Sequence, residues 1–323
     1  MNWTHHTATI NGISMHFVEQ GSGMPVVLCH GFPHLWFSWH RQITALASAG
    51  YRVIAPDMRG MGQTEAPPEP QAYDIDHITA DLIGLLDHLG VDKAVFAGLD
   101  FGAFAIYDLA LRHPQRVRAV IGLENPAAPH NPDEPPLSEY RRMAEEHFLH
   151  IEYFRVPPRA DRELAAQPRR FLHKVFHTLS GAGNYFDCFK HPPGTSYIDA
   201  MAEPPALPWH WLSELELEFF VSEYSRSGFT GGLNWYRSMD LKWAQRKPFE
   251  GVQSRVPAYF LGSEHDVDLE GFHGDDPISQ MRAIFPDLRQ VRMIPAAGHM
   301  VQLEASDQVN RILLDYLAEI AAA

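Results

Sequence analysis

The stretch V-F-A-G-L-D-F-G-A-F-A, residues 95–105, decides the fold of this chain of 323 residues. An apolar, β-prone run ends at Gly98, and a helix-forming run begins near Phe101. Small residues surround Asp100, as a sharp turn from a strand into a helix requires, because the backbone is crowded there. Asp100 is therefore predicted at the apex of the turn, either as the N-cap of the helix or as a side chain presented for chemistry. The stretch alone leaves both interpretations open.

Short apolar runs that alternate with helical patterns lie on both sides of this turn. The runs are typical of strands buried in a parallel sheet, and they cover residues 25–29, 51–57, 117–123, 256–262 and 289–294. Apolar residues at helical spacing occupy 38–49, 74–89, 277–285 and the segment from Ser306 onward. A hairpin is expected over 7–19, with Asn11-Gly12 at its turn. This alternation predicts an α/β fold with a mostly parallel, doubly wound sheet and helices on both faces.

The pattern changes in the middle of the chain. Residues 126–136 hold five prolines, and no convincing strand follows before about Trp243. Helices are expected over 138–154, 213–228 and 233–239. We therefore predict that residues 1–125 and 249–323 form one core, and that 126–248 form an all-helical lid (cap) over the active edge of the sheet.

Charge and composition exclude several classes of partner. The net charge of -14 argues against nucleic acid and against an anionic membrane surface, and no apolar run is long enough to cross a membrane. The sequence shows no pattern of a signal peptide, and its two cysteines, Cys29 and Cys188, lie far apart. We expect a cytoplasmic protein without disulfides, and a homodimer is left open.

A nucleophile needs a base and an acid that orients the base. His299, in A-G-H-M after a predicted strand, is the best-placed base among 19 histidines. Asp266 follows the preceding strand. Because the carboxyl ends of parallel strands meet at one edge, Asp100, the turn His30-Gly31-Phe32-Pro33 and Glu124 should converge there. The chain order of nucleophile, acid and base is that of the α/β-hydrolase arrangement.

These motifs resemble those of epoxide hydrolases with the α/β-hydrolase fold, over nearly the whole chain. H-G-F-P at 30–33 is similar to the family's oxyanion motif, and G-L-D-F-G at 98–102 to its nucleophile turn, where Trp more often stands in place of Phe101. The segment N-W-Y-R at 234–237 resembles the one that carries a ring-opening tyrosine, here Tyr236. A second such tyrosine is usual in a Tyr-x-x-Tyr-Phe segment, which here reads H-I-E-Y-F, with His150 in the first place.

A smaller bacterial group, the Cif-like epoxide hydrolases, is similar in pairing a lid histidine with a lid tyrosine. That group carries its charge-relay Glu at the end of the strand after the nucleophile helix, the position of Glu124 here. The chain therefore has two candidate acids for His299, of which Asp266 is favoured because Glu124 could bond a neighbouring loop instead. A histidine near its reference pKa of about 6.5 would also make ring opening more pH-sensitive than a tyrosine does.

The resemblance implies a cofactor-independent reaction between a small hydrophobic epoxide and water. Asp100 would attack the epoxide and form an ester, while Tyr236 and His150 meet the ring oxygen. Water activated by His299 would then hydrolyse the ester, with the backbone N–H groups of Phe32 and Phe101 holding the oxyanion. Aromatic side chains are expected to line the pocket, namely Trp36, Phe148 and Tyr153.

Other functions are weighed against this prediction. Haloalkane dehalogenases of the same fold usually place Trp directly after the nucleophile, where this chain has Phe101, and haloacetate dehalogenases place Arg where it has Phe101 and Phe104. A ligand-binding protein with disused chemistry is disfavoured by the intact set of nucleophile, acid and base. The pairs His147/His150 and His173/His177 lack a third ligand at matching spacing, so no metal site is expected. His150 and Tyr236, taken alone, could also be packing side chains.

Overall fold

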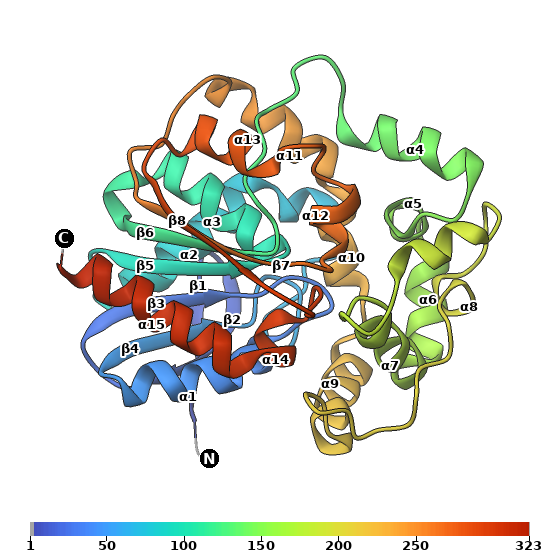
Figure 1. Ribbon diagram of the computed structural model, residues 1–323, viewed down its shortest axis with the longest axis horizontal. Helices are drawn as coiled ribbons and strands as arrows, with labels where there is room; N and C mark the ends of the chain where they lie inside the picture. The colour runs from blue at the N-terminus through green and yellow to red at the C-terminus, as the bar shows by residue number, and fades with distance from the viewer. Residues whose placement is uncertain (1–2, 323) are drawn as a thin grey trace.

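The computed structural model describes residues 3–322 and contains one sheet with helices on both faces (Figure 1). Its strand order is β1-β2-β4-β3-β5-β6-β7-β8, in which the pairs β1–β2 and β2–β4 are antiparallel and the pairs from β4 to β8 are parallel. The strands are β1 (Thr4–Ile10), β2 (Ile13–Gln20), β3 (Met24–Cys29), β4 (Tyr51–Pro56), β5 (Ala94–Leu99), β6 (Val117–Leu123), β7 (Ala258–Ser263) and β8 (Leu288–Ile294). The predicted hairpin and α/β fold are confirmed.

Alternate side chains of the buried strands enter two separate cores. Val26, Val95 and Ala97 pack with α1 (His40–Ser48) and α15 (Ser306–Ala322) on one face. Val27 and Phe96 pack with α2 (Ile75–His88), α3 (Phe101–Arg112) and α13 (Pro277–Ile284) on the other. This alternation follows from the two-residue repeat of a strand and explains the continuous apolar runs.

Between β6 and β7 the described chain holds only helices and loops, most of which gather beyond one side of the sheet in Figure 1. The α-helices are α4 (Pro136–Glu146), α5 (His150–Arg155), α6 (Arg159–Ala166), α7 (Pro168–Thr178), α8 (Tyr197–Ala200), α9 (Glu214–Ser227), α10 (Thr230–Arg237) and α11 (Met239–Arg246). The 3₁₀ segments there are η4 (Tyr185–Lys190) and η5 (Lys247–Phe249). A capping box of Ser213 with Glu216 opens α9, which confirms the start expected for this helix.

The helix predicted over 138–154 is two helices. His147 adopts an extended backbone after α4, and Leu149 is extended before α5. The N–H of Phe148 in this break donates to the carbonyl of His191 at 2.8 Å, so a tertiary contact replaces a helical one. The break matters because it makes His150 the first residue of a new helix with its own direction.

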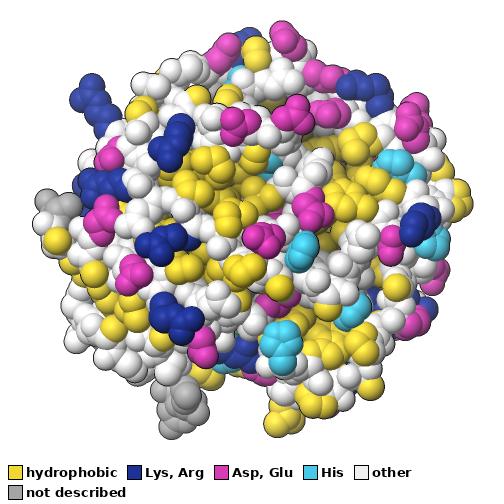
Figure 2. Space-filling view, viewed as in Figure 1, with side chains coloured by type: hydrophobic (Ala, Val, Ile, Leu, Met, Phe, Trp, Pro, Cys, Tyr) yellow, Lys and Arg dark blue, Asp and Glu magenta, His cyan; other side chains and the backbone are white. Residues whose placement is uncertain are grey.

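The remaining elements are short and connect the layers. They are η1 (Trp36–Trp39), η2 (Pro70–Tyr73), η3 (Pro114–Arg116), α12 (Val267–Gly271) and α14 (Val301–Glu304). No helix in the described range is long and apolar enough to cross a membrane. On the face drawn in Figure 2, basic side chains lie singly among acidic and hydrophobic ones, so this face presents no basic stripe for nucleic acid.

Candidate active site

Asp100 stands at a strained turn between β5 and α3. Its backbone has φ 55° and ψ -127°, a positive φ that a non-glycine residue adopts only where its surroundings enforce it. Crowding explains the small neighbours: a Cβ on Gly102 would lie 2.2 Å from the carbonyl oxygen of Cys29, and one on Gly31 would lie 1.8 Å from Oδ1 of Asp100. The Asp100 side chain makes no capping bond to α3, so the turn leaves its carboxylate for other partners.

The loop after β3 supplies one of these partners. The backbone N–H of Phe32 donates to Oδ1 of Asp100 at 2.7 Å. Phe101 is the first residue of α3, and its N–H is among the groups that a helix leaves without an intrahelical acceptor. Of the predicted oxyanion pair, the Phe32 N–H therefore contacts the Asp100 carboxylate, and the Phe101 N–H follows Asp100 directly in the chain.

His299 reaches the other oxygen of Asp100 from the loop after β8. Its Nε2 lies 3.8 Å from Oδ2 of Asp100, and its Nδ1 lies 2.6 Å from Oδ2 of Asp266. Asp266 is fully buried and caps α12, since its Oδ1 accepts from the N–H groups of Asp268 and Leu269 at 3.0 and 2.9 Å. These bonds hold the Asp266 carboxylate still, so it fixes the tautomer and direction of the imidazole.

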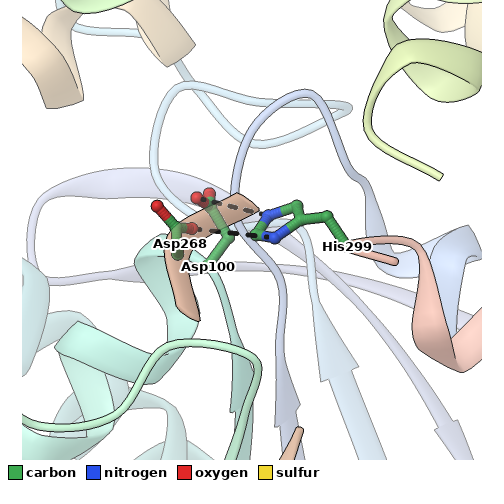
Figure 3. Close-up of side chains that lie close together, drawn as sticks. All are labelled: Asp100, Asp268 and His299. Carbon is green, nitrogen blue, oxygen red and sulfur yellow. Dashed lines mark ion pairs between the residues drawn. The ribbon is translucent and has the colours of Figure 1, made fainter. Parts of the chain in front are cut away.

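A further carboxylate belongs to this group and was not predicted. Oδ2 of Asp268 lies 3.7 Å from Nδ1 of His299 and accepts from the Asn125 amide at 2.6 Å. Figure 3 shows Asp100 and Asp268 turned toward the His299 ring. These three are the one group of metal-ligating side chains found in the described range. Asp266 already occupies Nδ1 of His299 and the Phe32 N–H occupies Oδ1 of Asp100, so two polar atoms of this group have hydrogen-bond partners.

Electrostatics favour a protonated His299 while Asp100 is ionised. Burial alone would lower the pKa of His299, but the carboxylates of Asp266, Asp100 and Asp268 outweigh it and hold that pKa well above its ordinary value. An ester on Asp100 would remove one of these negative charges. His299 would then lose its proton more easily, at the stage where a base is needed.

Glu124, the other candidate acid, has no hydrogen bond or ion pair with His299 among residues 3–322. Its Oε2 lies 2.9 Å from the N–H and 3.1 Å from the hydroxyl of Ser263, and that hydroxyl lies 3.0 Å from the carbonyl oxygen of Gly298. Burial and the nearby Asp266 charge raise the pKa of Glu124 well above its ordinary value. A protonated Glu124 that supports the loop before His299 through Ser263 accounts for these contacts.

Two side chains from the helical segment face this group across a cavity of about 110 Å³. Tyr236 of α10 lies with its ring 4.7 Å from that of Phe101, and its hydroxyl has no hydrogen-bond partner among residues 3–322. Burial and the Asp100 charge raise the pKa of Tyr236 well above its usual range, so it stays a donor. The ring of His150 stands perpendicular to that of Tyr236 at 5.8 Å.

Tyr185 sets the state of His150. The Tyr185 oxygen contacts Nδ1 of His150 and lies 3.5 Å from the His150 backbone N–H. An oxygen that accepts from that N–H can donate its own proton to Nδ1, and this arrangement places the proton of a neutral imidazole on Nε2. Burial lowers the pKa of His150 to about 4. The expectation of a histidine that titrates near 6.5 is therefore wrong, and His150 is a neutral N–H donor at neutral pH.

Comparisons with known proteins agree with this geometry. A profile of the alpha/beta hydrolase fold family matches residues 24–148. Epoxide hydrolase A of Mycobacterium tuberculosis is 40% identical over 97% of both chains, and the crystal structure of epoxide hydrolase A from Mycobacterium thermoresistibile superposes with a TM-score of 0.91, 39% identity and 98% coverage of both. The chain belongs to the epoxide hydrolases. An epoxide hydrolase from an endophytic Streptomyces is similar too, with a TM-score of 0.94, 33% identity and coverage of 99% and 97%.

Three predicted pocket residues of this epoxide hydrolase do not line the catalytic cavity. Trp36 belongs to the core that contains α1 and α15, and its ring lies 5.8 Å from that of Phe219. Phe148, in the helix break, lies with its ring 5.2 Å from that of Tyr197 and tilted to it, and Tyr153 donates its hydroxyl to Glu163 at 2.6 Å. Aromatic side chains that do line the cavity include Phe154, Phe171, Tyr185, Tyr197 and Phe272. With many aromatics in the chain, helical spacing gave no means to rank them.

Glu304 was also missed, and it ties the His299 loop to the helical segment. Its carboxylate accepts from the backbone N–H groups of Gly298, Met300 and Gly181 at 3.1, 3.1 and 2.8 Å. The N–H of His299 itself donates to the carbonyl of Leu179 at 2.8 Å. His299 is thus held partly by residues 179–181, a contact that no sequence motif predicts.

Proposed function

We propose that this epoxide hydrolase converts an epoxide to a vicinal diol through an ester on Asp100. The observation that carries the proposal is the contact set of this carboxylate, which has Phe32 N–H on Oδ1 and His299 on Oδ2. The oxygen held by the backbone donor is suited to become the ester carbonyl. Oδ2 is then the atom that attacks the epoxide carbon, with its electron pair forming the new C–O bond as the ring C–O bond breaks.

The ring oxygen needs a proton as it leaves. Tyr236 and His150 both present donors to the cavity, the phenol O–H and the imidazole N–H respectively. Neither group ionises near neutral pH in this setting. Donation from one or both to the developing alkoxide lowers the barrier of ring opening.

Hydrolysis of the ester on Asp100 follows, with His299 as the base. Neutral His299, oriented by Asp266, takes a proton from water, and the hydroxide adds to the ester carbon. The N–H groups of Phe32 and Phe101 hold the oxyanion on Oδ1, and losing one such donor typically costs ~3 kcal/mol of barrier. Collapse releases the diol, which receives the proton from His299. The second proton of the water leaves the Asp100 carboxyl group and returns to the donor that protonated the ring oxygen, which restores the Asp100 carboxylate.

The helical segment 126–248 acts as the lid in this proposal, because α5 and α10 deliver His150 and Tyr236 to the cavity. The boundaries at 125 and 249 stay a prediction from the sequence, as do the cytoplasmic location and the open question of a homodimer. Light scattering on the purified protein measures the assembly directly.

Product analysis tests the proposed reaction. The purified protein is incubated with styrene oxide, an aliphatic epoxide, fluoroacetate and a bromoalkane. Vicinal diol from at least one epoxide, with no halide release, is the expected result. Release of fluoride or bromide without diol would replace the proposal with a dehalogenase, whose nucleophile is the same kind of residue.

A further inference from the structure

A second cavity adjoins the catalytic one. It has a volume of about 240 Å³ and lies among α3, α4 and α11. Phe101, Phe104 and Phe272 belong to the walls of both cavities. A substrate whose epoxide sits at Asp100 can therefore extend past the Phe101 ring into the second space.

Lys242 of α11 lies on the wall of this second cavity. Its ammonium donates to the carbonyl oxygen of Trp235 at 2.8 Å and lies 5.0 Å from the ring centres of both Phe101 and Trp235. An ammonium carries three donors, and no carboxylate of the described range lies within ion-pair distance of this one. Lys242 is thus a partly buried cation in an aromatic setting that lacks a counter-ion.

Acidic groups near Lys242 are engaged elsewhere or lie at the surface. Asp108 accepts two hydrogen bonds from Arg246, at 2.9 and 2.7 Å. Glu134 accepts from Arg142, and Glu139 of α4 is exposed. A buried charge without a partner is costly, so a ligand that supplies the opposite charge gains affinity at this point.

We propose that the second cavity takes the carboxylate end of an epoxide-bearing acid and that Lys242 is its counter-ion. The inference rests on the proposed epoxide hydrolysis and names the substrate class for it. Aromatic walls, including Phe101, Trp235 and Trp243, pack the apolar chain between the two ends. Lys242 then selects among epoxides without touching the reacting atoms.

The protonation of Lys242 gives the proposal a second signature. Burial and the charge of Arg246 lower the pKa of Lys242 to about 7. The other titratable groups that face it or line the cavity are Asp74, Asp100, Asp108, His130, His273, Glu134, Glu139 and Tyr140. Because the ammonium is lost as pH rises through this value, the preference for an acid over its neutral ester should decline between pH 6 and pH 9.

The test compares terminal epoxy acids of increasing chain length with their methyl esters. In the wild type, kcat/KM should favour the acid by about tenfold at the chain length that spans the two cavities. Lys242→Gln keeps a donor for the Trp235 carbonyl but removes the charge, so the ratio should fall to near one while styrene oxide turnover stays within about twofold. The control is Lys247→Gln, an exposed lysine outside the cavity, which should leave the ratio unchanged.

Equal turnover of acids and esters at every chain length, or a preference that survives in Lys242→Gln, would overturn the proposal. Absence of turnover even with neutral epoxides would instead contradict the proposed function. In that case, octanoate binding measured by calorimetry tests the carboxylate site at Lys242 without any turnover. Tighter binding to the wild type than to Lys242→Gln supports the site, and equal binding refutes it.

Discussion

The two sides of the catalytic cavity are held in different ways. Asp100, Asp266 and His299 each follow the carboxyl end of a parallel strand, so the order of the sheet brings them to one edge. His150 and Tyr236 come from helices whose directions depend on a break after α4 and on packing between aromatic rings. Sheet topology therefore specifies the nucleophilic half of the site more strictly than helix packing specifies the donors above it.

The largest effect should come from the acid of the relay. Asp266→Asn keeps the size of the side chain but removes the charge that orients and supports His299, so turnover should fall by about 10³- to 10⁴-fold. The ester should accumulate, because its hydrolysis is slowed more than its formation. Steady-state rates and intact mass after single turnover measure both consequences.

Glu124→Gln is the matched control for Asp266→Asn, because both acids are buried beside the same loop. If Glu124 only supports the loop through Ser263, the loss in kcat should stay within about fivefold, the size of one altered hydrogen bond. A collapse equal to that of Asp266→Asn would show that the charge relay runs through Glu124.

The donors of the helical side should have intermediate effects on ring opening alone. Tyr236→Phe should slow ester formation by about 10²-fold, the low end for loss of a proton donor. The rate of ester hydrolysis should change little, since Tyr236 makes no contact with His299. Stopped-flow fluorescence under single-turnover conditions separates the two rates, and an equal loss in both would contradict the assignment.

Tyr185→Phe should have a smaller effect, through His150. Without the Tyr185 hydroxyl the imidazole is free to change tautomer and to rotate, so ester formation should slow by about tenfold. The variant His150→Tyr should restore the rate in the Tyr185→Phe background, because a phenol needs no such partner. If the effects of Tyr185→Phe and His150→Phe on the rate of ester formation are additive in the double variant, Tyr185 does not act through His150.

The last prediction is a change in stability, and it concerns the contact between the sheet and the helical segment. Burial raises the pKa of Glu304 to about 7, above the ordinary value of 4.5. Because the folded protein binds this proton more tightly than the unfolded chain does, protonation of Glu304 stabilises the fold. The stabilisation is complete below pH 4.5, the ordinary pKa, and is lost as pH rises to about 7, the folded-state pKa. For a shift of this size it amounts to roughly 3 kcal/mol. Glu304→Gln should flatten the dependence of Tm on pH in this window. An unchanged slope would contradict the shift.

The sequence predicted the fold well because strand patterns and strand ends carry the information. Short apolar runs located the buried strands, and the small residues around Asp100 located the turn. The convergence of Asp100, Phe32 and His299 follows from topology and needs no knowledge of side-chain packing.

What sequence reasoning missed depends on tertiary contacts. Asp268 lies two residues after Asp266, and only the geometry of α12 shows that both carboxylates approach His299. Tyr185 comes from the short η4 segment, where no periodicity marks a functional side chain. Trp36 was misplaced because an aromatic residue near a catalytic loop can pack on either side of it.

Trapping the ester in a His299→Ala variant tests the central claim most directly. This variant keeps the nucleophile and the donors but lacks the base, so a reactive epoxide should add its whole mass to the protein. Digestion should place the added mass on the peptide that contains Asp100, and Asp100→Ala in the same background should abolish it. An adduct on another residue, or diol release at the wild-type rate without any adduct, would contradict the account.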